Sequence, residues 1–101
     1  MSNAEAPLQL FKLHAVVSGH VQGVGFRAYT AERAEFLGLT GWVRNTFAGD
    51  VEVTAEGPRH SLDILLAALR KGPRGSQVID VRFDFDIPNG TFREFTITRT
   101  V

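Results

Sequence analysis

The hydrophobic period of this chain switches between two residues and three to four residues, and this switching constrains its fold more than any other feature. Alternating or β-rich apolar runs predict strands, whereas apolar residues at i, i+3, i+4 and i+7 predict helices. Strands are expected at residues 12–18, 39–45, 50–56 and 78–86, with a further extended stretch at 92–99. Helices are expected from Phe26 to Leu37, ended by Gly38, and from Pro58 or Ser61 to about residues 71–73.

Most of these elements have one face that is predicted to be buried. In the first helix the buried face consists of Phe26, Thr30, Ala34 and Leu37, and in the second of Leu62, Leu65, Leu66 and Leu69. In the 50–56 strand the inward residues are Val51, Val53 and Ala55, and the opposite face carries Asp50, Glu52, Thr54 and Glu56. In the 78–86 strand the inward residues are expected to be Ile79, Val81, Phe83 and Phe85.

The resulting order, β-α-β-β-α-β with a short strand at the C-terminus, predicts an α+β protein of ferredoxin-like type. Two helices would cover one face of a mostly antiparallel sheet and form a two-layer sandwich. The alternation in the third and fourth strands agrees with this fold, because the uncovered face of such a sheet is solvated.

Composition limits the classes of function. The chain has 101 residues, which fits one domain at 12–101 after a tail at 1–11, whose first four residues resemble a remnant of expression cloning. Eleven basic and eleven acidic residues give zero formal charge, which argues against a nucleic-acid-binding surface. There is no cysteine, no histidine pair at metal-ligand spacing, no signal peptide and no apolar run near the ~20 residues of a membrane span. A cytoplasmic protein without metal or membrane contact is expected.

The glycine-rich stretch at 19–25 connects the first strand to the first helix. Backbone N–H groups at such a junction lack helical partners, and glycines allow them to converge on an anion. The stretch is not a P-loop, because no Lys-Ser or Lys-Thr pair follows. Residues 23–28 match a dinucleotide-binding pattern, but the next strand ends in Arg44-Asn45 without an acidic residue for a ribose. A phosphate site is therefore one reading, and a loop that only turns sharply is the other.

Arg27 and Asn45 extend the phosphate reading. Arg27 falls in the first turn of the helix, where its charge is repelled by the positive end of the helix dipole. An anion bound there would offset both the arginine charge and the dipole. Its planar guanidinium can bind two phosphate oxygens at once. Asn45 ends the second strand, where its amide is either turn chemistry or a group that positions a water. Both residues could face one pocket, because the end of the first strand and the start of the helix lie near the second strand in a β-α-β unit.

Two long patterns carry a resemblance to a known family. The segments GHVQGVGFR at 19–27 and GWVRNTFAGDVEV at 41–53 match both signatures of the acylphosphatases in full, and the 18-residue step from Arg27 to Asn45 also fits. The resemblance covers about residues 12–99. It departs from many members at 72–78, GPRGSQV, outside both signatures, and Gly25 stands where some members carry a larger residue.

The resemblance implies hydrolysis of acyl phosphates to a carboxylate and inorganic phosphate, the latter acting as product and inhibitor, by a monomer without cofactor or metal. It implies that Arg27 binds the phosphate and that Asn45 orients the attacking water. It also implies a cradle of backbone N–H groups from His20, Val21, Gln22, Gly23, Val24, Gly25 and Phe26, with Gly19 and Thr46 in support. His20 is not expected to act as a base, because the signature leaves its position variable.

Two alternatives stay open at this point. Domains of this kind also occur inside larger maturation proteins that handle carbamoyl phosphate. RNA-recognition domains share the β-α-β-β-α-β order, but they carry aromatic residues on the third strand, where this chain has VEVTAEG.

Overall fold

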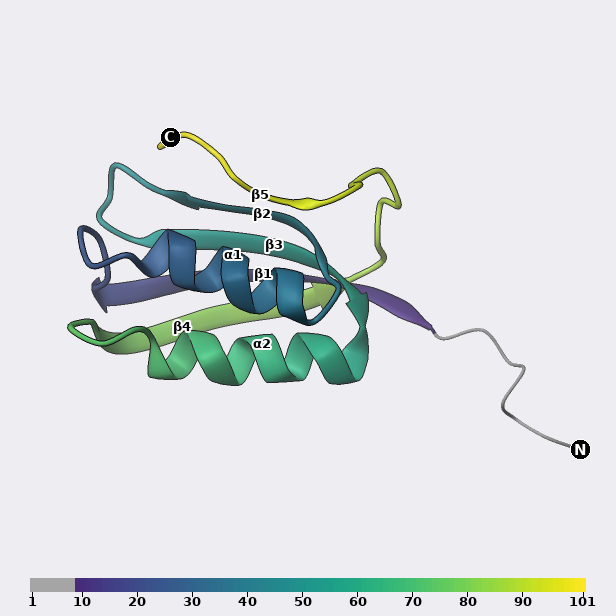
Figure 1. Ribbon diagram of the computed structural model, residues 1–101, viewed down its shortest axis with the longest axis horizontal. Coiled ribbons are helices and arrows are strands. Elements are labelled where there is room, and N and C mark those ends of the chain that lie inside the picture. Colours follow the sequence, from purple (N-terminus) through teal and green to yellow (C-terminus); the bar gives the residue numbers. More distant parts are fainter. Residues whose placement is uncertain (1–8) are drawn as a thin grey trace, which may run out of the picture.

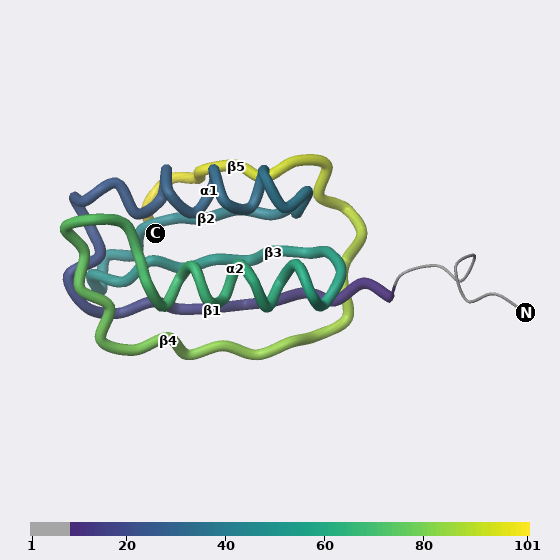
Figure 2. The backbone as a smooth tube through the Cα atoms, turned by 60° about the horizontal axis from the view of Figure 1, so that its bottom comes forward, coloured from purple at the N-terminus to yellow at the C-terminus, as the bar shows by residue number. Residues whose placement is uncertain are grey.

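The computed structural model describes residues 9–101, which form two helices and five strands (Figure 1). The strands are β1 (Leu10–His20), β2 (Thr40–Asn45), β3 (Val51–Pro58), β4 (Gln77–Asp86) and β5 (Phe95–Ile97). The helices are α1 (Phe26–Phe36) and α2 (Arg59–Lys71). Both helices lie on the same face of the sheet (Figure 2), which confirms the expected ferredoxin-like α+β sandwich.

The sheet has the order β4-β1-β3-β2-β5. All neighbouring strands are antiparallel except β2 and β5, which are parallel. Because β1 and β2 are both antiparallel to β3, they run in the same direction and end at the same end of the sheet. The N-terminus of α1, the turn between β2 and β3, and the C-terminus of α2 therefore meet at that end, on the left of Figure 1.

The core lies between the sheet and the helices. The predicted faces of both helices are confirmed, since Phe26, Thr30 and Ala34 are buried, Leu37 is half-buried, and all four leucines of α2 are buried. The sheet contributes Leu13, Ala15, Val17, Val43, Val51, Val53 and Ala55. Each large apolar side chain buried in this way contributes about 1.5–3 kcal/mol relative to exposure. This packing fixes α1, and with it the loop before α1, against the end of the sheet.

The inward face of β4 differs from the prediction at Ile79, which is exposed. The pairing of β1 with β4 shifts between Ser18 and Gly19, so that Asp80 pairs with Ser18 and Val78 pairs with Gly19. Ile79 is thus the extra residue of a β-bulge, which interrupts the two-residue period of a strand. Val78 is half-buried in its place.

Phe83 and Phe85 lie beyond the helices at the edge of the sheet. The inward prediction is also wrong for Phe83, which is 42% exposed, whereas Phe85 is half-buried against the core. The Arg59 guanidinium lies 3.8 Å from the centre of the Phe85 ring, and Arg70 lies 5.2 Å from that of Phe83. Arginines of α2 therefore cover this edge in place of apolar side chains.

The expected solvated face of β3 is also partly covered. Thr54 and Glu56 are each only 6% exposed. The Glu56 carboxylate accepts hydrogen bonds from the backbone N–H groups of Asn89 at 2.7 Å and Gly90 at 3.1 Å. The segment between β4 and β5 thus folds over this part of the sheet, and the alternation of β3 could not reveal this long-range contact.

Glu52, on the same face, joins two other side chains. Its carboxylate lies 2.7 Å from His14 Nε2, and it accepts a hydrogen bond from Arg44 Nε at 2.9 Å. Burial raises the pKa of Glu52, but the hydrogen bonds and charges of His14 and Arg44 outweigh burial and hold that pKa below its ordinary value. Arg44, the residue before Asn45, is thereby held on the face opposite to α1.

Candidate active site

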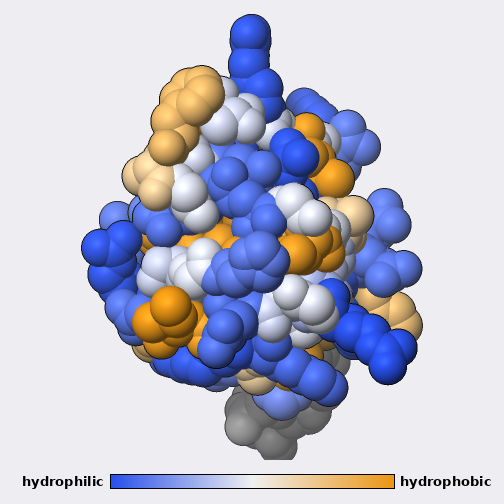
Figure 3. Space-filling view, turned by 90° about the vertical axis from the view of Figure 1, so that its left-hand side faces the viewer, coloured by the Kyte–Doolittle hydropathy of each residue, from blue (hydrophilic) through white to orange (hydrophobic). Residues whose placement is uncertain are grey.

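A pocket of ≈ 230 Å³ lies at the end of the molecule where β1 and β2 end and α1 begins. Figure 3 views this end, where hydrophobic side chains are visible among hydrophilic ones. The pocket is lined by Val21, Gly23, Gly25, Phe26, Arg27, Ala28, Asn45 and Ile97. Six of these eight residues belong to the predicted site residues, and two, Ala28 and Ile97, do not.

The loop before α1 offers free backbone donors to this pocket. The first helical bond of α1 at this end runs from Tyr29 N to Gly25 O, and no side chain caps the helix. Among residues 9–101, no hydrogen bond uses a backbone N–H of residues 21–28 as donor. A helix N-terminus with free N–H groups and a positive dipole end attracts anions.

Gly23 and Gly25 give this loop its shape. Their φ angles are +76° and +79°, in the left-handed region where other residues are strained. A Cβ at either position would meet no heavy atom within 4 Å, so there is space for a larger residue at Gly25. The backbone conformation, rather than crowding, therefore explains glycine at these two positions.

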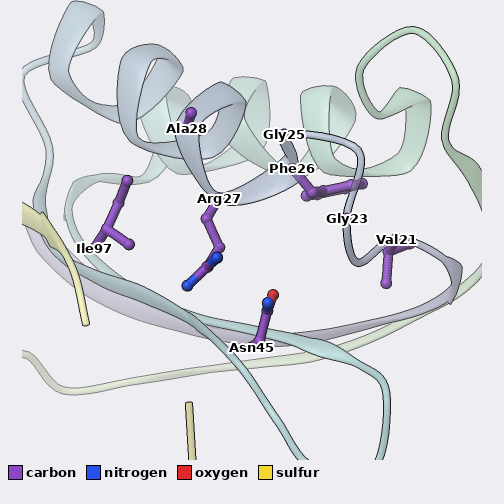
Figure 4. A pocket seen from close by; sticks show the side chains of 8 residues that line it. All are labelled: Val21, Gly23, Gly25, Phe26, Arg27, Ala28, Asn45 and Ile97. Atoms are coloured by element: carbon purple, nitrogen blue, oxygen red, sulfur yellow. The ribbon is translucent and has the colours of Figure 1, made fainter. Parts of the chain in front are cut away.

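Arg27 adds a charge that no side chain in residues 9–101 neutralises by an ion pair. The first turn of α1 contains no acidic residue. In Figure 4 the Arg27 side chain points from α1 across the pocket toward Asn45. The guanidinium and the free N–H groups of the loop thus give one pocket an uncompensated positive potential, which suits a dianion.

Asn45 enters the pocket from the end of β2, and its side chain points toward Arg27 (Figure 4). The turn that follows is held by hydrogen bonds within itself: Thr46 N donates to Asp50 O at 2.9 Å, and Asp50 N donates to Thr46 Oγ1 at 3.2 Å. The Gln22 side chain donates to Thr46 O and to Asp50 O, both at 2.8 Å. Gln22 therefore links the glycine-rich loop to the turn beside Asn45 through two hydrogen bonds.

The end of the chain holds the same turn from the other side. Phe47 N donates to Val101 O at 2.9 Å, and Val101 N donates to Asn45 O at 3.3 Å. The backbone of Asn45 is thus held by Val101 as well as by its pairing with Val51 of β3, which limits the positions that its amide can take.

Some of the predicted loop residues lie outside the pocket. His20 and Gly19 belong to β1, where they pair with Gln77 and Val78 of β4, and the His20 side chain is exposed. A Cβ on Gly19 would collide with the Gln77 backbone, so Gly19 supports the site by permitting close strand pairing. Val24 packs against the core. The loop outside the strand is therefore residues 21–25, shorter than the predicted 19–25.

The two unpredicted residues give the pocket an apolar side. Ala28 follows Arg27 on α1, and Ile97 projects from β5 beside β2. Ile97 belongs to a strand whose partner could not be inferred from local sequence pattern.

Two further observations concern the described part of the chain. Residues 9–101 contain no group of three or more His, Asp or Glu side chains arranged to hold a metal ion. Neither helix has the length and apolar character required to span a bilayer.

Comparison with known proteins identifies the family. The family model described as acylphosphatase matches residues 13–97. The chain belongs to the acylphosphatase family. It is 49% identical over 81 residues to the acylphosphatase of Syntrophotalea carbinolica, an alignment that covers 80% of this chain and 88% of the relative. Its enzymatic class is that of an acylphosphatase, a hydrolase of acyl phosphates.

Solved structures agree with this membership. The crystal structure of acylphosphatase from Bacillus subtilis superposes with a TM-score of 0.84 at 34% identity, over 87% of this chain and 98% of that chain. The fold alone also occurs within a much longer protein, full-length HypF, with a TM-score of 0.87 at 20% identity over 95% of this chain and 13% of that chain.

Proposed function

We propose that the protein hydrolyses the carboxyl–phosphate bond of acyl phosphates by attack of a water that Asn45 orients. The phosphate is held by the Arg27 guanidinium and by the free backbone N–H groups of residues 21–26, without His20, which pairs with β4. The observation that carries this proposal is that Arg27 and Asn45, from separate elements, line one pocket with glycines of the loop. Product phosphate binds the same cradle, because it shares the recognised group.

The proposed reaction requires stabilisation of the charge on the phosphoryl group and positioning of the water, rather than a strong acid or base. The water oxygen forms a bond to phosphorus while the bond between phosphorus and the carboxyl oxygen breaks. The carboxylate leaves with the electron pair of that bond, and it is a stable anion that needs no protonation. The proton of the water passes to an oxygen of the transferred phosphoryl group, so that no side chain has to accept it.

The protein is proposed to act as a monomer in the cytoplasm. Arg27, Asn45 and the free N–H groups of the loop supply every contact that the proposed mechanism requires, so the mechanism needs no residue from a second copy. RNA is a poor partner for the sheet, because the face of β3 opposite to the helices carries Glu52, Thr54 and Glu56 instead of aromatic residues, and Thr54 and Glu56 are buried there. The likeness to HypF concerns the fold alone and does not favour a role within a larger maturation protein.

Inorganic phosphate should inhibit hydrolysis competitively and raise the thermal stability of the protein. Binding to the native state alone stabilises it by about 2.7 kcal/mol at a hundred times the dissociation constant. The measurement is the melting temperature and the initial rate with benzoyl phosphate over a series of phosphate concentrations, with sodium chloride at matched ionic strength as control. Equal effects of phosphate and chloride would contradict the proposed cradle.

His20→Ala should retain activity within about tenfold, because a group outside the reacting centre contributes little to turnover. The His20 side chain is exposed and does not line the pocket. The rate should therefore show no step that depends on this residue between about pH 5 and about pH 8, where histidines commonly titrate. Turnover of both proteins is measured across this range.

A loss above about a hundredfold, with a pH step that disappears in the variant, would instead make His20 the general base. His60→Ala, which alters an exposed histidine of α2, is the matched control.

A further inference from the structure

We propose that Ile97, together with Ala28, forms the part of the pocket that receives the acyl group, so that Ile97 selects among acyl phosphates by the apolar size of that group. This inference rests on the proposed function and concerns the half of the substrate that the phosphate cradle does not contact. It assigns a role to the two pocket residues that the sequence did not indicate.

The composition of the pocket divides it into two sides. The loop residues 21–26, Arg27 and Asn45 provide the N–H groups, the guanidinium and the amide, which are suited to a phosphate and a water. The remaining lining residues, Ala28 and Ile97, have side chains that consist only of hydrocarbon. In Figure 4 Ile97 lies on the side of Arg27 away from Gly23 and Val21. An acyl group bound there would extend away from the glycine-rich loop.

The strand register places Ile97 close to the reacting centre. Ile97 pairs with Val43 in the parallel β2–β5 ladder, and Asn45 follows Val43 by two residues. Residues two apart point to the same face of a strand, so Asn45 and Ile97 share the face that α1 covers. The strand spacing and rise place their Cα atoms roughly 8 Å apart. A substituent on the acyl carbon can reach Ile97 from a phosphate beside Asn45.

Ile97 has apolar surface left to bury. Its side chain is 48% exposed, whereas its ladder partner Val43 is completely buried. Because the hydrophobic contribution follows the apolar area removed from water, a bulky acyl group gains from this contact and a small one does not. Benzoyl phosphate carries a ring that can cover Ile97, and acetyl phosphate carries only a methyl group. The side chain therefore favours the larger substrate.

The test compares kcat/KM for benzoyl phosphate and acetyl phosphate in the unaltered protein and in Ile97→Ala. We expect the variant to lose about tenfold with benzoyl phosphate, the size of discrimination that a few apolar carbons provide, and less than about twofold with acetyl phosphate. The inhibition constant of phosphate should stay within about twofold, because phosphate has no acyl group. Ile97→Val should shift the same ratio in the same direction by a smaller factor.

Ile64→Ala is the matched control. Ile64 is an isoleucine of similar exposure, 43%, on α2, and it does not line the pocket. It should leave both substrates and phosphate inhibition unchanged. This control separates a loss at the pocket from a general loss of folded protein.

The possible results are distinct. An equal loss with both substrates would give Ile97 a structural role, and no loss with either would remove it from the acyl side; both results overturn the inference while leaving the proposed function intact. Failure of the unaltered protein to hydrolyse either substrate would contradict the proposed function and this inference together.

Discussion

Arg27→Gln should lower kcat/KM by about 10³–10⁵, the range found when an arginine that stabilises a transferring phosphoryl group is removed. The substitution keeps a side chain of similar length and polarity but removes the charge and the planar pair of donors. Arg27 has no ion-pair partner in residues 9–101, so removal of its charge leaves no carboxylate without a partner. The fold should therefore remain stable. The positive charge contacts phosphate in the substrate, transition state and product, so phosphate inhibition should weaken as well.

The measurement is steady-state kinetics with benzoyl phosphate, combined with the inhibition constant of phosphate. Arg33→Gln is the matched control, because it removes the same charge from the same helix at an exposed residue outside the pocket. Arg33 lies over the ring of Tyr29 and should affect kcat/KM by less than about threefold. A loss below about tenfold in Arg27→Gln, or unchanged phosphate inhibition, would contradict the role proposed for Arg27.

Local sequence pattern predicted most of the fold, because the buried side chains of the core recur at the regular spacings of helices and strands. Leu62, Leu65, Leu66 and Leu69 are all buried, as the helical spacing indicated. The prediction was wrong where a contact is not local. Ile79 is exposed because a β-bulge inserts one residue, and Glu56 is buried because a distant segment donates two N–H groups to it. Neither event is visible in the alternation of apolar and polar residues in the sequence of the strand concerned.

The candidate site was predictable to the extent that it depends on β1, α1 and β2. The order of these elements predicts that the start of α1 and the end of β2 meet, and Arg27 and Asn45 do line one pocket. Ile97 could not be found in this way, because its position depends on the parallel pairing of β5 with β2, more than fifty residues earlier in the chain. The supports of the Asn45 turn are of the same long-range kind, since Gln22 and Val101 reach it from distant parts of the chain.

Asn45→Ala should lower kcat by about 10²–10³, the usual cost of removing one preorganised polar group at a reacting centre. Its effect should differ in kind from that of Arg27→Gln, because the amide is proposed to hold the attacking water and not the phosphate. Phosphate inhibition should therefore stay within about threefold of the unaltered protein. The backbone of Asn45 is held by its ladder partners, so the turn should keep its conformation without the amide.

The decisive measurement is the comparison of kcat with the inhibition constant of phosphate in Asn45→Ala and Arg27→Gln. Asn89→Ala is the matched control, because Asn89 is an exposed asparagine whose amide oxygen accepts only a long 3.4 Å hydrogen bond from Lys12, far from the pocket. Since water positioning contributes to the transition state and not to the binding of product, only Arg27→Gln should weaken phosphate binding strongly. Equal weakening in both variants would mean that Asn45 is a phosphate ligand, and the water would then need another partner.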